Sequence, residues 1–568
     1  MIRHNGPISG VAAFGGAHVA TAGYDNQVVL WDARRREPLA RSFHDHLANQ
    51  VAFSPDGSSL LSASSDYTAR LWSVPDLRLK AVYGEHEDDV EMAAFHPSGQ
   101  LVATASRDHR VRVFEVSGRL VATFEGHTAD VISVEWSAGT DELLSSSDDG
   151  TIKRWSLGSG RMVADIDLDG VETDTIAITG SGVVYAGNDD GAIIRIGDGS
   201  TARHPAHDAG IKRLVHHAAT GRLVSLSYDR TVRVWDTSDG LVRRHVAEFP
   251  AEIWARSCAF VDDTTLAFAT FGSAYATYRL DTGAWDLTGV EPTRCVNAVT
   301  TVDGRVCTVG DAGVVRADGQ PLSEPGSLCN FLVEAGGRIL TGGQLGRVFD
   351  AATGEMLHQH RSPLNCATGF VREGVPHVVV GAYTGEGLVF ALRQDGTTAH
   401  VATLPLHSGA VKGVAVSGDT LFAVCADGSA SWFSVKALRE TGRLPDAHGK
   451  IANGCAALTG GRFVSVSRDL RLRVWEGESA RTVSTPHDHS IKCVAASRDG
   501  RLVATGSYSG VVAVHDVRTG DWPHVSRPTT AGISCLHYDA AGNRFLASSY
   551  DGDVYPVPAA PAPGGARG

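Results

Sequence analysis

The sequence predicts an all-β fold made of about fourteen four-stranded units in tandem. First, a set of His, Ser or Thr, Asp and Trp with fixed spacing recurs along the 568 residues. Second, the stretches between these residues alternate apolar and polar positions and turn at Gly or Asp, as β-hairpins do. Third, the Asp of the set returns about every 41 residues, the period of a four-stranded propeller blade, at Asp25, Asp66, Asp108, Asp149, Asp190, Asp229, Asp311, Asp427, Asp469 and Asp551.

The clearest copy of the repeat lies at residues 207–236, where the set is His207, Ser225, Asp229 and Trp235. Two other copies keep this spacing, and a third shortens only the step from His to Asp by one residue. Their members are His44, Ser62, Asp66 and Trp72; His127, Ser145, Asp149 and Trp155; and His448, Ser465, Asp469 and Trp475.

Four short stretches resemble the WD-repeat (tryptophan-aspartate) β-propeller family: ARLWS at 69–73, IKRWS at 152–156, VRVWD at 232–236 and FSPDG at 53–57. The resemblance covers nearly the whole chain and implies two tandem seven-bladed β-propellers, as in a bacterial tandem-propeller type. We expect the first ring at 1–288, the second at 289–557 with eroded early repeats, and a disordered tail at 558–568. Since only three residues precede the first His, the strand that closes one ring is expected to be short or missing.

Composition excludes several classes of protein. A net charge of −13 argues against attachment to nucleic acid or to an anionic membrane, and no apolar run is long enough to span a bilayer. The nine cysteines show no CxxC spacing, which predicts neither a disulfide framework nor a zinc site and indicates a cytoplasmic protein. The preference for Arg over Lys, with abundant Ala and Gly, indicates a high-GC and therefore bacterial genome. No cofactor is expected.

The recurring Ser, His and Asp invite comparison with a hydrolase triad, in which Ser225 would be the nucleophile, His207 the base and Asp229 the orienting group. An enzyme rarely needs about six identical triads in one chain. The resemblance implies instead that each set is a hydrogen-bond network that ends on the indole nitrogen and makes its blade rigid. We therefore expect neither a catalytic nor a metal site from these residues.

The resemblance also implies that partners bind at the mouth of the central channel, on the face that carries the Asp turns. The contacts would come from the residue before each turn Asp and from a residue early in each first strand. In the first ring these are Tyr24, Arg107, Tyr228, Asn49 and Glu91; in the second they are Arg294, Lys412, Arg468, Lys492, Tyr508 and Tyr550. The second mouth is the more basic, which favours an acidic peptide or loop as its partner. Truncating Tyr24, Arg107 or Tyr228 is expected to change stability by no more than about 0.5 kcal/mol, as at ordinary surface positions.

These observations favour a non-catalytic scaffold or recognition subunit that binds a partner protein or peptide at a channel mouth. Two alternatives stay open. One is a propeller with a small-molecule or metal site at a channel mouth, acting as a biosynthetic enzyme or accessory subunit, for which the eroded repeats seven to ten offer room. The other is a sensor subunit of a bacterial signalling or defence assembly.

Overall fold

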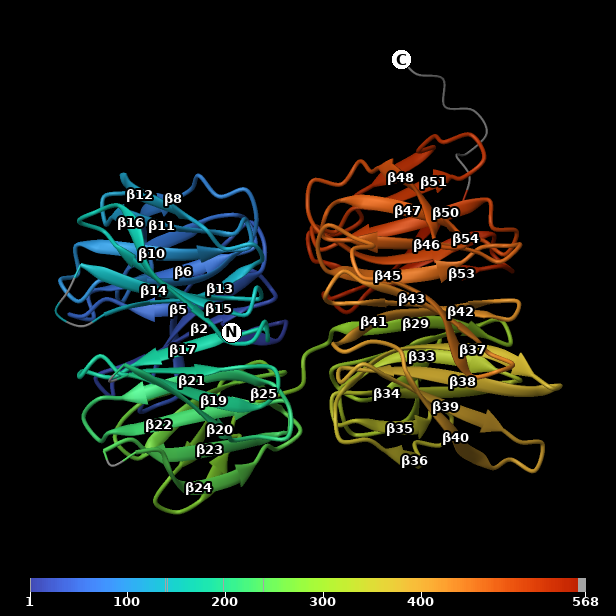
Figure 1. The fold of residues 1–568 in the computed structure, drawn as a ribbon. Helices are drawn as coiled ribbons and strands as arrows, with labels where there is room; N and C mark the ends of the chain where they lie inside the picture. Colours follow the sequence, from blue (N-terminus) through green and yellow to red (C-terminus); the bar gives the residue numbers. More distant parts are fainter. Residues whose placement is uncertain (1, 138, 140, 198, 239, 560–568) are drawn as a thin grey trace. The chain divides into compact units, whose positions relative to one another are not determined.

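The computed structural model describes residues 2–137, 139, 141–197, 199–238 and 240–559. These residues form 55 β-strands and no helix, so none of them belongs to a helix that could cross a membrane (Figure 1). The strands make thirteen four-stranded sheets and one three-stranded sheet, each built from consecutive antiparallel strands. The predicted all-β fold of about fourteen blades is confirmed.

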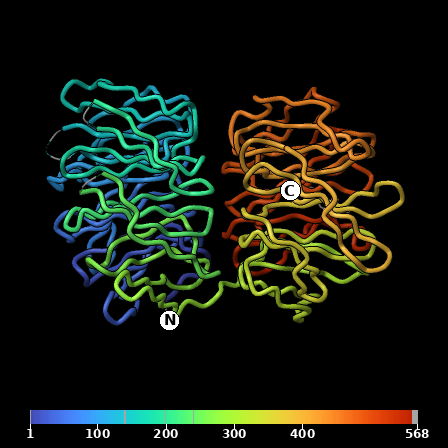
Figure 2. Tube along the Cα trace, turned by 60° about the horizontal axis from the view of Figure 1, so that its bottom comes forward, coloured from blue at the N-terminus to red at the C-terminus, as the bar shows by residue number. Residues whose placement is uncertain are grey.

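The chain divides into two compact units, Met1–Thr293 and Arg294–Gly568, which we call the first and second rings. Figure 2 follows the chain through the blades of each unit. In the first ring the opening strands of the seven blades are β1 (Ile8–Phe14), β5 (Ala48–Phe53), β9 (Val90–Phe95), β13 (Val131–Trp136), β17 (Thr175–Ile178), β21 (Ile211–His217) and β25 (Ile253–Phe260). In the second they are β29 (Val296–Val302), β33 (Cys329–Ala335), β37 (Leu364–Arg372), β41 (Val411–Ser417), β45 (Ala452–Ala457), β49 (Ile491–Ala496) and β53 (Ile533–Asp539).

These opening strands form the inner wall of each ring. Each one contacts the opening strand of the next blade, and the circle closes because β25 contacts β1 and β53 contacts β29. The hydrophobic core lies between neighbouring sheets. Val113 and Phe124 of the third blade, for example, pack with Val131 and Trp155 of the fourth, and the rings of Phe124 and Trp155 stack at 5.3 Å.

The first ring closes without adding an N-terminal strand to its last blade. That blade ends with the three-residue strand β28 (Ala284–Asp286), which pairs only with β27 (Ala276–Arg279). Across the closing seam Trp31 packs edge-on against Tyr275 at 5.7 Å, and the His4 amide donates to the Ser273 carbonyl at 3.0 Å. The seam is therefore held by side-chain packing and a few hydrogen bonds rather than by a shared sheet.

The second ring closes in a similar way. In the described residues its last blade has three strands, β53, β54 (Arg544–Ser549) and β55 (Val554–Pro558). Across the seam Thr301 Oγ1 lies 2.8 Å from His537 Nε2, and Cys295 Sγ donates to the Tyr550 carbonyl at 2.9 Å. Ala559, which follows β55, is 1% exposed. Residues 560–568 of the expected tail lie outside the described residues.

Candidate functional site

The repeated His, Ser, Asp and Trp residues form a buried network in the first ring. His207 places Nδ1 2.8 Å from Asp229 and Nε2 2.7 Å from Ser225 Oγ, and the Trp235 indole donates to the same hydroxyl at 2.9 Å. The blades of His44 and His127 have the same bonds at 2.6 to 2.8 Å. Each serine hydroxyl is buried and bonded to both the imidazole and the indole of its blade. This arrangement therefore stabilises a blade rather than presenting a nucleophile.

The twelfth blade varies the pattern. His448 Nε2 and the Trp475 indole both bond to Ser465, at 2.7 and 2.8 Å. However, His448 Nδ1 lies 3.1 Å from the Gly428 carbonyl of the preceding blade. Asp469 accepts from the Gly449 amide and pairs with Arg473. Here the imidazole joins two blades, whereas elsewhere it joins two parts of one blade.

A β-bulge near the start of most opening strands leaves one residue outside the ladder of paired residues, and we call it the bulge residue. In the first ring the ladder shifts identify Ser9, Asn49, Glu91, Ile132 and Lys212. In the second ring they identify Asn297, Asn330, Asn365, Lys412, Asn453, Lys492 and Ser534. These residues therefore occupy equivalent places around the inner wall.

The bulge residues of the second ring form a belt of hydrogen bonds from blade to blade. Each Asn or Ser side chain donates to the carbonyl of the residue that directly precedes the bulge residue of the next blade. The amide bonds are Asn297 to Cys329 at 3.1 Å, Asn330 to Leu364 at 2.8 Å, Asn365 to Val411 at 3.0 Å and Asn453 to Ile491 at 2.7 Å. Ser534 bonds in the same way to Val296 and so crosses the closing seam.

Lysine occupies the other two positions of this belt, at Lys412 and Lys492. The Lys412 ammonium lies 4.7 Å from the centre of the Tyr383 ring, and that of Lys492 lies 5.8 Å from the centre of the Tyr508 ring. Tyr508 in turn stacks on Tyr550 at 6.4 Å. We call the group of Lys412, Lys492, Arg468, Tyr383 and Tyr508 the second-ring mouth.

Three cations, Lys412, Lys492 and Arg468, lie close enough at the second-ring mouth to act on one another. Burial, together with the charges of Lys492 and Arg468, lowers the pKa of Lys412 to about 8. Burial alone would raise the pKa of Tyr508, but these three cations outweigh it and lower that pKa. In the part of the chain that the structure describes, no carboxylate lies within ion-pair distance of Lys412. The site therefore holds like charges together in a half-buried place, where an anion would stabilise them.

Arg294, the remaining residue of the expected second-ring set, is an exposed residue before β29, and Asn297 is the bulge residue of that blade. The expected position differs from the observed one because the eighth repeat has no His from which to count along the strand. The asparagines of the belt were also missed. Their signal is a single Asn just inside an opening strand, as in CVNAV, LCNFL and LNCAT.

The first ring carries a different cluster at the equivalent place. Arg107 donates from Nε to Glu91 at 2.5 Å and pairs with Asp130, and Glu91 also pairs with Arg256 at 3.1 Å. Arg107 is only 9% exposed. The structure therefore makes Arg107 a member of a buried ion-pair cluster, in contrast to the exposed turn residue that the sequence suggested.

Lys212 of the first ring is paired with Asp174 and Asp189, and its ammonium lies 5.2 Å from the Tyr228 ring centre. Burial would lower the pKa of Lys212, but the two carboxylates raise it well above its usual value. Burial, and then the like charges of Glu172 and Asp174, raise the pKa of Asp148 well above its usual value, because each disfavours the ionised carboxyl. In the first-ring mouth, Arg107 and Lys212 are thus both paired with carboxylates of the same ring.

The other expected first-ring residues lie around the same cluster. Tyr24 packs edge-on against Trp254 at 5.2 Å, and Arg256 lies 5.5 Å from the Trp254 ring centre. Asn49 donates to Ser65 and to the Val90 carbonyl. Trp254 and Arg256 were missed because the seventh repeat has lost its His, Asp and Trp and its opening strand is irregular between Ile253 and Cys258.

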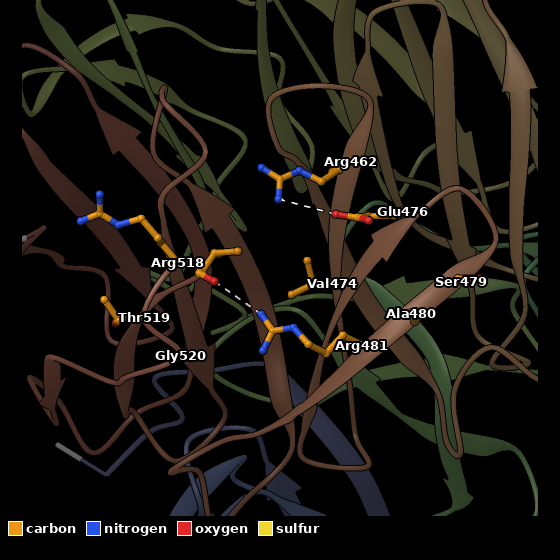
Figure 3. A pocket seen from close by; sticks show the side chains of 10 residues that line it. Arg462, Val474, Glu476, Ser479, Ala480, Arg481, Arg518, Thr519 and Gly520 are labelled. Atoms are coloured by element: carbon orange, nitrogen blue, oxygen red, sulfur yellow. Dashed lines mark hydrogen bonds and ion pairs between the residues drawn. The ribbon is translucent and has the colours of Figure 1, made fainter.

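An open groove on the outer side of the second ring is a separate feature (Figure 3). It lies between β47 (Arg471–Glu476) and β48 (Ser479–Ser484) of one blade and the turn after β51 (Val512–Asp516) of the next. Arg462 pairs with Glu476 at 3.9 Å, and Arg481 donates to the Val517 carbonyl at 3.5 Å. Arg462 and Arg481 are thus already bonded to other residues that line the groove.

Comparison with known proteins agrees with the blade pattern. Residues 37–73, 77–115, 118–156, 199–236 and 478–516 match the family model described as "WD domain, G-beta repeat". Similar proteins include the transcriptional corepressor LEUNIG_HOMOLOG of Arabidopsis thaliana, 27% identical over 38% of this chain and 28% of its own length. A subunit of chromatin assembly factor 1 from Gallus gallus is 28% identical over 44% and 36%. Autophagy-related protein 16 of Arabidopsis thaliana is 27% identical over 42% and 49%.

This chain thus spans less than half of the length of these relatives, all of which are eukaryotic, and the bacterial origin stays a prediction. By their names the three relatives are a corepressor, part of an assembly factor and an autophagy-related protein. The chain contains WD40 repeats, and a role in protein interaction is the broad function that they indicate.

Proposed function

We propose that this chain is a non-catalytic interaction subunit and that its second-ring mouth binds an acidic segment of a partner protein. The observation that carries the proposal is the pair of lysines in the belt. At five of seven positions the bulge residue is an Asn or Ser that bonds to the next blade, whereas Lys412 and Lys492 bring charge to the same wall.

The chemistry of the mouth supports an anionic ligand. Lys412 is half-buried, and desolvation together with the charges of Lys492 and Arg468 lowers its pKa. Glutamate or aspartate side chains of a partner would neutralise these charges in a partly desolvated place, where a charge pair is stronger than in water. Tyr383, Tyr508 and Tyr550 would supply flat contact area, which is the usual contribution of tyrosine to interfaces.

The catalytic and sensor alternatives have less support. The Ser, His and Asp sets bond within their blades, which leaves scaffold or recognition work as the better account. A sensor subunit would use the same mouth and differ only in its partner. Nine free cysteines fit the reducing conditions of the cytoplasm, where we place the protein.

Titration of the full chain with a fluorescent peptide rich in glutamate tests the proposal. We expect binding that weakens with salt, because surface charges are screened. Lys412→Glu should reduce the affinity at least about tenfold, which corresponds to about 1.4 kcal/mol. Lys436→Glu makes the same charge change at an exposed position of the same blade and should leave the affinity unchanged. Equal losses in both variants, or none in either, would contradict the proposed site.

A further inference from the structure

The eleventh blade keeps its histidine and its turn aspartate but has lost the hydroxyl that joins imidazole to indole in complete blades. Its turn aspartate is Asp427, and Ala423 stands four residues earlier, where complete blades carry the hydroxyl that joins imidazole to indole. Phe433 replaces the tryptophan. His407 instead bonds to two serines, Ser429 at 2.8 Å from Nδ1 and Ser431 at 3.1 Å from Nε2. The usual network therefore does not explain why this blade has a buried histidine.

A thiol stands beside that histidine. Cys425 lies two residues before Asp427, at the position of Ser64, which in the second blade donates to the His46 carbonyl at 3.3 Å and accepts from the Asp66 amide at 3.0 Å. Serine also occupies this position in the fourth, sixth and twelfth blades, at Ser147, Ser227 and Ser467. The eleventh blade thus has a cysteine where these four blades have a serine.

Three different ligand types converge here. One ligand atom each from His407, Cys425 and Asp427 lies within 4.8 Å of the other two. His407 and Cys425 are buried and Asp427 is exposed, so the cluster opens to solvent on one side. Ser429 Oγ bonds to Asp427 at 2.5 Å and to His407, and its oxygen is a fourth polar atom beside these three ligand atoms.

We propose that His407, Cys425 and Asp427 bind a zinc ion that joins the loop before β41 to the turn between β42 (Thr420–Cys425) and β43 (Ala430–Ser434). Nitrogen, sulfur and carboxylate oxygen are the ligands that zinc takes in proteins, at roughly 2.0 to 2.3 Å from the metal. Ligands of a tetrahedral zinc lie roughly 3.3 to 3.8 Å apart at those lengths. The observed cluster therefore needs only small side-chain movements to close on an ion.

The charge balance is also suitable. Binding releases the Cys425 proton to solvent, and the thiolate and the Asp427 carboxylate then match the two positive charges of zinc. Arg443 approaches His407 at 3.5 Å, but it is paired with Glu440 at 2.6 Å, which offsets its repulsion. The ion would make the link between loop and turn that hydrogen bonds make in complete blades. This inference does not depend on what the second-ring mouth binds.

Metal titration of the chelator-treated full chain tests the site. We expect about one zinc per chain to survive dialysis, measured by elemental analysis, and zinc to raise Tm because it binds only the folded site. Cadmium should produce a thiolate-to-metal charge-transfer band. Cys425→Ser should abolish that band and keep the fold, since serine is the residue of the related blades. Cys493→Ser changes another thiol of the same ring and should keep the band.

The band surviving in Cys425→Ser, or being lost equally in Cys493→Ser, would overturn the site, as would less than about 0.1 zinc per chain. Asp427→Asn provides a second variant at an exposed position should Cys425→Ser fail to fold. It should reduce cadmium affinity at least tenfold, and unchanged affinity would also overturn the proposal.

Discussion

Lys212 of the first ring and Lys412 of the second occupy the same bulge position of their blades, and each lies against a tyrosine ring. Lys212 is paired with Asp174 and Asp189, which raise its pKa well above the usual value despite burial. For Lys412, desolvation and the neighbouring cations act in the same direction and lower the pKa to about 8. One position of one fold thus carries a neutralised lysine in the first ring and an available positive charge in the second.

The comparison shows that some bulge positions can carry different residue types without loss of the blade network or the belt. In the second ring most bulge residues bond to the next blade. In the first ring Glu91 and Lys212 are held in ion pairs with Arg107, Arg256 and the neighbouring aspartates. The first mouth satisfies its charges internally, whereas we propose that the second uses its lysines for a partner.

The largest expected effect is on stability, at Arg107. Arg107→Ala leaves Glu91 and Asp130 buried beside fewer cations, so the first ring should lose about 3 to 5 kcal/mol. Hydrogen exchange of the amides at 90–136 measures this loss. Arg110→Ala removes an exposed arginine that pairs with Glu87 and Glu125 and is the control, with an expected loss of less than about 1 kcal/mol. If both variants lost the same free energy of unfolding, the first mouth would behave as an ordinary surface.

A smaller loss is expected at Asp229, where Asp229→Ala removes the carboxylate that bonds to the His207 imidazole and should cost about 1 to 3 kcal/mol. Asp190→Ala is the matched control, because Asp190 is the turn aspartate of an eroded blade and pairs only with Arg203 among its described neighbours. It should cost no more than about 0.5 kcal/mol.

Asp229 also predicts an acid transition. Burial raises its pKa, but His207 and the other bonds outweigh burial and hold the pKa at about 2. A carboxyl whose pKa is depressed on folding stabilises the fold above its unfolded pKa of 3.8 and loses that contribution as pH falls toward 2. Denaturant unfolding between pH 5 and pH 2 should show a smaller loss in Asp229→Ala than in the wild type, because the variant lacks this carboxyl but keeps those of the other blades. A loss of the same size in both would contradict the assignment.

A substitution in the thirteenth blade, Ser509→Asp, should increase the free energy of unfolding by about 1 kcal/mol. Ser509 stands where complete blades have Asp, and His487 Nδ1 is buried with no hydrogen-bond partner among the described residues. Burial lowers the pKa of His487 to about 4. The unfolded histidine takes up its proton near pH 6.5, so stability should fall as pH decreases from 6.5 to 4. Ser509→Asp should raise stability and reduce this dependence, as denaturant unfolding would show. An unchanged pH dependence would mean that the missing acceptor does not set the pKa of the histidine.

The smallest expected effect is the pH dependence of peptide affinity. Because the pKa of Lys412 is about 8, its charge is lost as pH rises, and affinity for an acidic peptide should fall a few-fold between pH 7 and pH 9. Lys412→Arg keeps its charge and should flatten the profile. Tyr508 and Cys425 also face Lys412, as do Lys492 and Arg468, so Tyr508→Phe is the control and should keep the fall. A flat profile in the wild type would exclude Lys412 as the titrating contact.

Much of the fold could be predicted from the sequence because the period is local. In the complete repeats the turn Asp lies 6 residues before its aromatic, and that spacing is set by one hairpin of one blade. The burial of Arg107 could not be predicted in this way, since Glu91 and Asp130 reach it from other strands and loops of the ring. The positions of Trp254 and Arg256 could not be predicted either, because their strand is irregular and gives no register from which to count residues.

The most direct test replaces both lysines of the belt by the residue that their neighbours carry. The double variant Lys412→Asn, Lys492→Asn should form belt bonds to the Ala452 and Ile533 carbonyls, as Asn365 and Asn453 do to the blades that follow them. We expect unchanged or higher thermal stability together with a loss of acidic-peptide affinity of at least about 2 kcal/mol, roughly thirtyfold. Full affinity in a variant that folds normally would contradict the account, because the lysines would then be dispensable for binding.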